Sequence, residues 1–278
     1  MENDPALTKL CELEALLGSI GAMRGIGVAL SGGVDSLTLA AVAHAVLGSR
    51  ATMYHAQSPA VPQEATARVE AMAAARGWRL DVFDAGEFAR AEYLVNPVDR
   101  CFHCKTSLYE TMRARSAAQL VSGTNLDDLR EYRPGLRAAS EHAVRHPYVE
   151  IGANKERVRA MARVLGLGGV AELPAAPCLA SRIETGIGID AAMLSLVHAS
   201  ERLIDAAVAP RTVRCRVRAA GVVLELDAAT LDGIEAERRA GLAAEVSGIF
   251  AGAGFAQPVS FAPYRNGSAF VVRGDERS

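Results

Sequence analysis

The stretch IGVALSGGVDSLTLA, residues 26–40, decides the fold expected of this chain. An apolar run that ends at Leu30 is typical of a buried strand, and the alanine-rich segment that begins near Asp35 is typical of a helix. A strand that passes into a helix within so few residues directs the backbone N–H groups of the turn toward the helix N-terminus. That geometry binds anions. An ordinary turn between a strand and a helix is the alternative interpretation.

The turn itself, SGGVDS at residues 31–36, carries residue types that suit a phosphate group. Gly32 and Gly33 allow the backbone to approach a ligand closely and to adopt positive φ. Ser31 and Ser36 offer hydroxyls to phosphate oxygens. The loop is not of the Walker type, because the lysine that belongs after the second glycine is missing here.

SGGVDS instead resembles the pyrophosphate loop of the ATP pyrophosphatase superfamily, whose members split ATP into AMP and pyrophosphate to adenylate a substrate. The resemblance implies an ATP site that includes Ser31, Gly32, Gly33, Asp35 and Ser36. It also implies that Asp35 lies near Mg²⁺ and the phosphates. A helix N-terminus alone attracts an anion by only ~0.3–1 kcal/mol, so the metal ion and basic side chains must hold most of the pyrophosphate charge. Lys155 and Arg157, near the start of a later helix, are candidates, with a solvated helix face as the alternative.

Strand and helix patterns alternate over the first two thirds of the chain. Buried strands are expected at residues 26–30, 51–57, 79–84 and 119–125, with helices between them at 35–48, 63–77 and 103–116. This alternation predicts an α/β fold in which helices cover both faces of a parallel sheet. The resemblance implies the same architecture, that of a pyrophosphate-loop domain.

The pattern changes after Ile183, where a glycine-rich link follows. A helix is expected at residues 191–208, strands at 212–218 and 221–227, a second helix at 235–253, and strand-like runs at 257–264 and 268–274. We therefore expect two domains. Residues 1–185 form an ATP pyrophosphatase domain, and residues 186–278 form a smaller α+β domain that binds the substrate phosphate and mediates oligomerisation.

Composition narrows the class of protein. The formal charge of −2 and the pI near 6.3 argue against a protein that coats nucleic acid through bulk positive charge. No stretch reaches the ~18 uninterrupted apolar residues of a membrane span, and the opening MENDPALTKL lacks the order of a signal peptide. A cytoplasmic location is expected, so the five cysteines should be thiols or metal ligands. Two of them, Cys11 and Cys215, are expected to be packing residues.

The other three cysteines form a candidate metal site. RCFHCK places two residues between Cys101 and Cys104, just before the expected helix, and APCLASRI places Cys178 in a loop bounded by proline. A CxxC pair with one distant cysteine suits a four-iron four-sulfur cluster with one iron open. Zinc with His103 as a fourth ligand is an alternative, although His103 directly precedes Cys104 and zinc ligands are usually two to four residues apart. Free thiols are a further alternative.

The order of four motifs is similar to that of the LarE family, the sulfur transferases that make the nickel-pincer nucleotide cofactor. These motifs are SGGVDS, NPVDRCFHCK, GTNLDDLREYRPGLRAA and PCLASRI, and RVRAAG and YRNGS follow in the family's order. The resemblance covers nearly the whole chain. It implies a two-step reaction on pyridinium-3,5-biscarboxylic acid mononucleotide: ATP adenylates a carboxylate, then sulfur displaces AMP to leave a thiocarboxylate. It also adds Gly123, Asn125 and Asp127 to the ATP site.

Cys178 occupies the family's sulfur-donor position. In members with this cysteine alone, the residue gives up its own sulfur and becomes dehydroalanine. Here Cys101 and Cys104 accompany it, so the resemblance is to the branch in which three cysteines hold a four-iron four-sulfur cluster that binds sulfide. That branch implies a multi-turnover catalyst supplied by sulfide or by cysteine-derived sulfur.

The C-terminal part supplies the expected contacts to substrate. The residues that the resemblance implies are Ser181, Glu201, Arg216, Arg218 and Arg265. Arg216 and Arg218 alternate along a strand and project from the same face, spaced to grip a phosphate, and Arg214 has the same parity. A solvent-facing arginine stripe is the alternative. The run VVLELD is shorter than the family's continuation and lacks its arginine, which leaves substrate contacts from that strand open.

Two other functions remain open from the sequence. A tRNA thiolase also combines a pyrophosphate loop with three cysteines, but it needs a basic surface or an RNA-binding appendage, and the sequence shows neither. A non-catalytic redox sensor that binds nucleotide is the second alternative. The members of the LarE family form hexamers of two trimers, which we expect here as well.

Overall fold

The computed structural model describes residues 5–130 and 132–270, and the chain groups into two compact units. The first unit comprises Met1–Arg90 and Asp99–Ala176, and the second comprises Ala91–Val98 and Pro177–Ser278. The functional division into residues 1–185 and 186–278 stays a prediction. Each unit has its own sheet.

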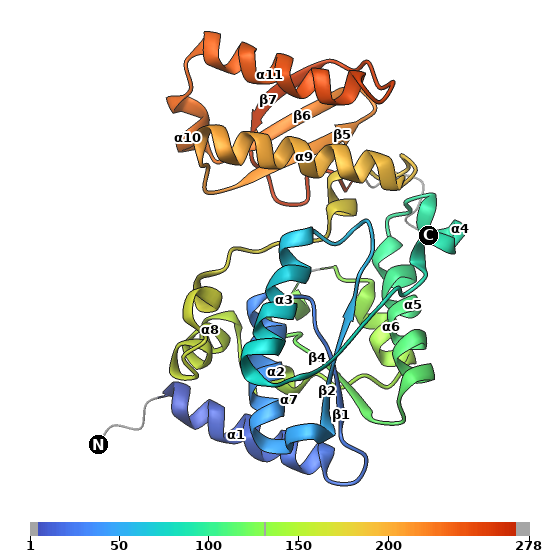
Figure 1. Cartoon of the computed structure of the whole chain (residues 1–278), viewed down its shortest axis with the longest axis vertical. Helices are drawn as coiled ribbons and strands as arrows, with labels where there is room; N and C mark the ends of the chain where they lie inside the picture. Colours follow the sequence, from blue (N-terminus) through green and yellow to red (C-terminus); the bar gives the residue numbers. More distant parts are fainter. Residues whose placement is uncertain (1–4, 131, 271–278) are drawn as a thin grey trace. The chain divides into compact units, whose positions relative to one another are not determined.

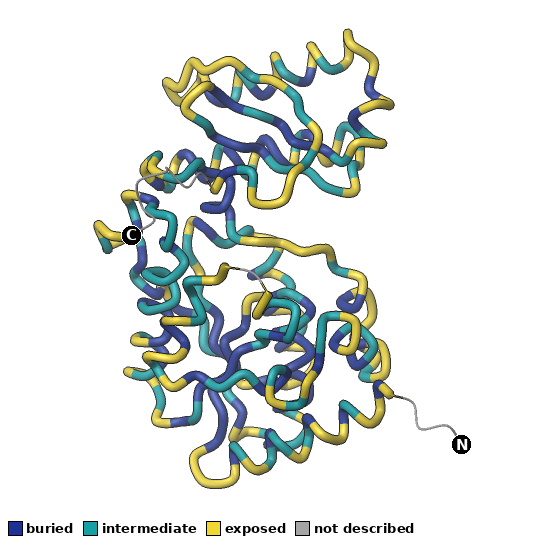
Figure 2. The backbone as a smooth tube through the Cα atoms, turned by 180° about the vertical axis from the view of Figure 1, so that it is seen from behind, coloured by how far each residue is buried: buried dark blue, intermediate teal, exposed yellow. Residues whose placement is uncertain are grey.

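A parallel sheet forms the centre of the first unit (Figure 1). Its strands are β1 (Ile26–Ala29), β2 (Ala51–Ala56), β3 (Arg79–Phe83) and β4 (Gln119–Ser122), in the order β3-β2-β1-β4. Each neighbouring pair is parallel. Short apolar runs bury both faces of such strands. Strand β1 and most of β2 and β4 are buried, whereas β3 is mostly half-buried (Figure 2). The expected α/β fold is confirmed.

Helices cover both faces of this sheet. One face packs against α1 (Pro5–Gly21), α2 (Val34–Leu47), α3 (Gln63–Arg76) and α8 (Lys155–Val164), and the other against α5 (Arg100–Arg115) and α6 (Gly135–Glu141). Consecutive residues of β1 show the alternation, because Val28 joins the first apolar cluster and Ala29 the second. The core therefore lies in two layers, one on each side of the sheet.

Short helices connect the longer elements. They are η1 (Gly48–Arg50), η2 (Glu87–Ala89), α4 (Ala91–Leu94), η3 (Leu126–Arg130), α7 (Pro147–Glu150), η4 (Gly168–Glu172) and η5 (Leu179–Arg182). Helix α5 begins at Arg100 rather than at the expected residue 103, since the amide of Phe102 donates to the carbonyl of Asp99 at 2.7 Å. The CxxC pair therefore lies inside the helix rather than before it.

The second unit contains a smaller mixed sheet with helices on one face. Its elements are α9 (Ala191–Val208), β5 (Val213–Arg218), β6 (Gly221–Leu226), α10 (Ala228–Gly233), α11 (Ala236–Ala251) and β7 (Val259–Pro263). Strand β6 pairs antiparallel with β5 and parallel with β7. The strand expected at 268–274 is wrong for residues 268–270, which form the end of a turn and an irregular residue, and its remainder lies outside the described residues.

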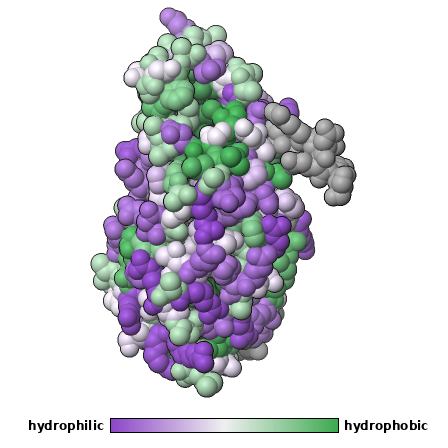
Figure 3. Space-filling model, turned by 90° about the vertical axis from the view of Figure 1, so that its right-hand side faces the viewer, coloured by the Kyte–Doolittle hydropathy of each residue, from purple (hydrophilic) through white to green (hydrophobic). Residues whose placement is uncertain are grey.

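The two units differ in their surfaces. In Figure 3, hydrophilic side chains cover most of the visible face of the first unit, whereas hydrophobic side chains gather on part of the second. None of the helices described is both long enough and apolar enough to cross a membrane.

Candidate functional site

The order of the strands places the first candidate site. From β1 the chain builds β2 and β3 on one side and then adds β4 on the other side of β1. The last residues of the neighbouring strands β1 and β4, Ala29 and Ser122, are register partners, so the loops that follow them leave from the same edge of the sheet. Open parallel sheets bind ligands at such a switch point. Residues 31–36 and 123–128 meet there.

The backbone of the glycine loop is held by its neighbours. Gly32 has φ +81, which favours glycine, and a Cβ there would lie 2.9 Å from the carbonyl oxygen of Ala65. The guanidinium of Arg68, on α3, donates to the Gly32 carbonyl at 2.9 Å. The Ser36 hydroxyl accepts from the Ser31 amide and donates to the Gly33 carbonyl, both at 3.1 Å. These contacts within the protein fix the shape of the loop.

Gly33 differs from Gly32 because the fold does not require a glycine there. Its φ of −86 and ψ of 166 suit any residue. The nearest atom to a Cβ at this position is the Ser31 hydroxyl oxygen at 3.7 Å, an ordinary contact. The missing side chain leaves open space beside the start of α2. This is the place where a helix N-terminus receives an anion.

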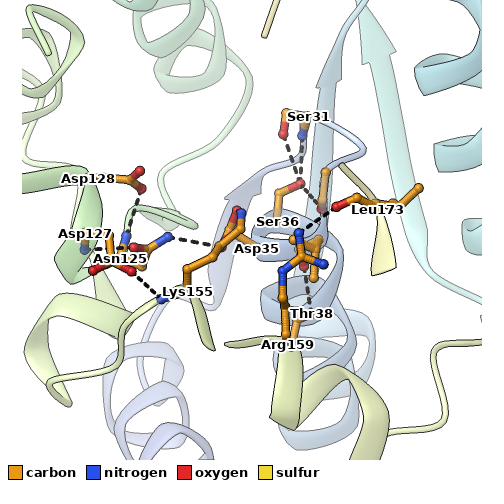
Figure 4. Close-up of polar contacts among 12 residues, drawn as sticks. Ser31, Asp35, Ser36, Thr38, Asn125, Asp127, Asp128, Lys155, Arg159 and Leu173 are labelled. Atoms are coloured by element: carbon orange, nitrogen blue, oxygen red, sulfur yellow. Dashed lines mark hydrogen bonds and ion pairs between the residues drawn. The ribbon is translucent and has the colours of Figure 1, made fainter. Parts of the chain in front are cut away.

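Asp35 is the centre of a polar cluster that joins three segments of the first unit (Figure 4). The amide group of Asn125 donates to Asp35 Oδ1 at 3.1 Å. The ammonium of Lys155, at the start of α8, donates to Asp35 Oδ2. The Lys155 backbone amide in turn donates to Asp127 Oδ2 at 2.9 Å. The structure thus brings together Asp35, Asn125, Asp127 and Lys155, whereas Arg157 is exposed on the same helix.

The loop after β4 is built to fit against the start of α2. Inside this loop, the amide of Asp127 donates to Asn125 Oδ1 at 2.9 Å, and the amide of Asn125 donates to Asp128 Oδ2 at 3.1 Å. A Cβ on Gly123 would lie 3.0 Å from the backbone of Asp35, so the glycine allows the two loops to approach closely. Asn125 is 2 % exposed, which fixes its side chain toward the cluster.

Tyr148, on α7, was not predicted from the sequence, yet its side chain contacts the backbone of Asp35. Its hydroxyl donates to the Asp35 carbonyl at 3.0 Å, and the side chain is fully buried. Burial raises the pKa of Tyr148 well above its ordinary value, with the Asp35 carboxylate adding to the effect. The phenol therefore stays neutral and keeps its proton for this bond. A tyrosine more than a hundred residues away gives no local signal of such a role.

The CxxC cysteines lie on the first turns of α5, in the first unit. Cys101 and Cys104 are both half-buried. His103 between them lies 3.8 Å from an Asp99 oxygen. Arg137 lies over the ring of Phe102 at 3.7 Å, and α6 packs beside this end of α5. Polar groups of Asp99 and Arg137 and the ring of Phe102 thus lie beside the CxxC pair.

Cys178 belongs to the second unit, directly before η5. It is half-buried, whereas the four residues that follow, 179–182, are buried. Ser181 and Glu201, the two predicted substrate residues of this region, are each connected to the Arg182 guanidinium. Across residues 5–130 and 132–270, no three side chains of His, Cys, Asp or Glu come together as a metal site. The grouping of the three cysteines stays a prediction.

The predicted phosphate-binding arginines lie on the sheet face opposite α9 and α11. Arg216 is 4 % exposed, and its guanidinium donates to Glu225, to the Ser181 carbonyl and to the Arg265 carbonyl. Arg218 also donates to Glu225, at 2.7 Å, but its side chain is 30 % exposed. The structure therefore gives Arg216 partners within the protein and leaves Arg218 at the surface.

An open cavity of about 570 Å³ lies on this face. Its polar lining comes from Arg218, Glu225, Ser260, Arg265, Asn266 and Ser268. Ser268 donates to Glu225 at 2.7 Å, which fixes the loop that follows β7 against the sheet. Two arginines beside hydroxyl and amide groups suit an anionic ligand.

The other two cysteines have different surroundings. Cys215 is fully buried, as expected, and burial raises its pKa, so it is an inert packing residue. The same expectation is wrong for Cys11, which is exposed. The buried stripe of α1 passes through Leu10, Leu13 and Leu17, and Cys11 lies outside it.

No protein-family profile matches the chain. An uncharacterized protein of Synechocystis is 37% identical over 194 residues, which cover 68% of this chain and 72% of the relative. An uncharacterized protein of Methanocaldococcus jannaschii is 26% identical, over 64% of this chain and 68% of the relative.

A third relative has a functional name. The pyridinium-3,5-bisthiocarboxylic acid mononucleotide synthase of Lactiplantibacillus plantarum is 27% identical over 206 residues, which cover 72% of this chain and 74% of the synthase. The chain therefore belongs to the family of the Synechocystis protein, and its distant similarity to the synthase supports the LarE family.

Proposed function

We propose that this protein is an ATP-dependent sulfur transferase that converts the carboxylates of a pyridinium dicarboxylate mononucleotide to thiocarboxylates. The observation that carries the proposal is the Asp35 cluster beside the glycine loop, at the switch point of a parallel sheet. The named relative supports a sulfur-transferase role in cofactor biosynthesis.

The first step activates the substrate. A substrate carboxylate oxygen attacks the α-phosphorus of ATP. The bond between the α-phosphorus and the oxygen that bridges to the β-phosphorus breaks, and pyrophosphate leaves. The product is an acyl adenylate, which has the leaving group that a carboxylate lacks. The open space at Gly33 and the hydroxyls of Ser31 and Ser36 suit the phosphates. Lys155 supplies positive charge at the same place.

The site suits Mg²⁺. Magnesium is usually held by one or two carboxylates together with the substrate phosphates, so a cage of protein ligands is not needed. Asp35 is the carboxylate within the loop itself, and its side chain is 22% exposed. When bound, the metal ion would neutralise developing charge on the phosphates.

The second step transfers sulfur. A sulfide-level sulfur attacks the carbonyl carbon of the acyl adenylate, the bond to the AMP oxygen breaks, and AMP leaves with that electron pair. Cys178 is half-buried at the start of a buried segment, which makes it the cysteine of the second unit suited to this step. Cys215 is excluded by its complete burial.

The donor set fits an iron–sulfur cluster. Cys101 and Cys104 are half-buried and lie one helical turn apart on α5, and Cys178 offers a third thiol. Soft thiolate ligands select such clusters over hard metal ions. When bound, a four-iron four-sulfur cluster with one open iron would supply a coordination position for sulfide.

The cavity of the second unit suits the phosphate of the substrate. Arg218 is partly exposed at its wall, and Arg265 is exposed in the loop that follows β7. The single negative charge of Glu225 is shared by the positive charges of Arg216 and Arg218, so net positive charge remains for an anion. This observation favours Arg218 and Arg265 over Arg216 as the groups that touch phosphate.

Arg218→Ala should raise the KM for the mononucleotide substrate roughly ten- to a hundredfold, because a charge-assisted contact to phosphate contributes about 1.5–3 kcal/mol. The KM for ATP should change less than twofold. Steady-state pyrophosphate release with each substrate varied measures both constants. Arg238→Ala is the matched control, since Arg238 is an exposed arginine of the same unit that pairs with Glu245. Equal changes for both substrates would contradict the assignment.

Gly33→Ala should weaken ATP binding by about 10²-fold, because a methyl group displaces phosphates that must lie against the loop. The fold should be unaffected, since the position has ordinary φ and no close neighbour. Calorimetric titration with ATP and thermal melting measure the two effects. Gly169→Ala, at another open position of the first unit, is the control. Normal ATP affinity in Gly33→Ala would remove the loop from the ATP site.

One experiment tests the proposed function as a whole. The purified protein is incubated with ATP and Mg²⁺, alone and with the dicarboxylate mononucleotide or bulk tRNA, and pyrophosphate is measured. We expect release that depends on the mononucleotide, with thiocarboxylate found by mass spectrometry when sulfide is present. Release that depends on tRNA would instead identify a tRNA thiolase. No release with any addition would favour a nucleotide-binding sensor.

A further inference from the structure

We propose that Arg182 is a positioning residue that fixes the backbone of Cys178 for sulfur transfer. The inference rests on the proposed function of Cys178. Arg182 is 3 % exposed and lies four residues after Cys178, at the end of η5. It lies within the PCLASRI motif, but it is not among the predicted site residues.

The guanidinium of Arg182 contacts the cysteine's own backbone. Its Nη1 donates to the Pro177 carbonyl at 2.6 Å, to the Cys178 carbonyl at 3.1 Å and to the Ser181 hydroxyl at 3.0 Å. The Cys178 carbonyl also accepts from the Ser181 amide at 3.0 Å. Both peptide planes around the cysteine are therefore held from inside the unit, and the remaining freedom of the thiol is rotation about its own side-chain bonds.

The other edge of the guanidinium is held equally firmly. Nε and Nη2 of Arg182 donate to the two oxygens of Glu201 at 2.8 and 3.0 Å. Glu201 lies on α9, and its Oε1 also accepts from the backbone amide of Cys215 on β5 at 2.9 Å. The planar fork of arginine matches a carboxylate in this way, and a lysine ammonium cannot reproduce it. Arg182 thus connects the cysteine to a helix and a strand of the second unit.

A purely structural arginine is available for comparison. Arg239 donates to the carbonyls of Leu231 and Ile234 at 2.8 and 2.9 Å, in the same unit and far from Cys178 along the chain. It fastens the connection between α10 and α11. Arg182 has the same kind of carbonyl contacts, but its acceptors belong to the proposed sulfur-transfer residue and to the residue before it. Placement of a reacting group is sensitive to shifts of about 1 Å, which change rates by about 10²-fold.

Arg182→Lys tests the inference through the coupling of the two reaction steps. The variant keeps a cation beside Glu201 but loses the planar guanidinium that donates to Glu201 and to the two backbone carbonyls at once. We expect pyrophosphate release and both KM values within twofold of the native protein, and AMP formed per thiocarboxylate should rise about 10- to 100-fold. In protein freed of iron, so that no cluster covers the thiol, and without ATP or substrate, iodoacetamide should alkylate Cys178 several-fold faster, as followed by peptide mass spectrometry. Arg239→Lys should change neither quantity.

Pro177→Gly provides a second test at an exposed position. It keeps the carbonyl that Arg182 binds but removes the fixed φ before the cysteine. It should uncouple the steps and speed alkylation in the same direction, whether or not Arg182→Lys yields folded protein. Unchanged coupling and unchanged alkylation in Pro177→Gly, or in folded Arg182→Lys, would overturn the inference. If native protein forms no thiocarboxylate, the proposed function fails, and the alkylation rates still decide whether Arg182 holds Cys178.

Discussion

Asp35→Asn should lower pyrophosphate release by about 10²- to 10³-fold, the loss typical when one electrostatic contact to a transition state is removed. The substitution is nearly isosteric, and its amide oxygen can still accept from Asn125, which bonds Asp35 at 3.1 Å in the native protein. The negative charge that would hold Mg²⁺ is lost. Rapid-quench measurement of pyrophosphate with saturating substrate gives the rate.

Asp81→Asn is the matched control for this prediction. Asp81 lies on β3 in the same unit and forms an ion pair with Arg115 at 3.3 Å. Because such exposed pairs contribute only about 0–1 kcal/mol, its loss should leave both stability and pyrophosphate release nearly unchanged. Any cluster should persist in both variants. Native-like ATP cleavage by Asp35→Asn would remove Asp35 from the mechanism.

Cys101→Ser should abolish sulfur transfer as completely as Cys178→Ser. If the three thiolates hold one cluster, removing any ligand releases or cripples it. Iron and sulfide content, with the anaerobic absorption spectrum, should fall to background in both variants. Adenylation should survive, because the glycine loop and the Asp35 cluster contain none of these cysteines.

Cys11→Ser is the control, since that thiol is exposed on α1 outside the proposed site. After turnover with added sulfide, Cys178 should still be a cysteine by peptide mass spectrometry. A single full turnover by Cys101→Ser, together with dehydroalanine at residue 178 in the native protein, would show a sacrificial donor instead.

The parallel sheet was predictable because its four strands are short apolar runs separated by helical segments. Their predicted bounds differ from the observed ones by no more than a few residues at the C-terminal ends. The start of α5 was not predictable from hydrophobic pattern, since Cys101, Phe102 and His103 give no clear helical stripe. A bond between backbone atoms at Asp99 and Phe102 sets that start.

Much of the candidate site could be predicted, while its supports could not. Local motifs indicated the glycine loop and the residues after β4, because both follow strand ends that a parallel sheet brings together. Tyr148 and Arg68 act through backbone carbonyls of distant residues, which no motif encodes. The burial of Arg216 likewise depends on Glu225 across the strand pair, so strand parity alone did not separate Arg216 from Arg218.

The contact between Lys155 and Asp35 has a consequence for ligand choice. Free inorganic phosphate could bind the Lys155 ammonium only if the ion pair with Asp35 broke, which would leave the Asp35 carboxylate without a counter-charge. A nucleotide that arrives with its metal ion brings a cation for the carboxylate and an anion for the ammonium in one event, so both groups exchange partners without a net loss. At the proposed ATP site, the ion pair would therefore discriminate against simple anions in favour of triphosphates that carry a metal ion.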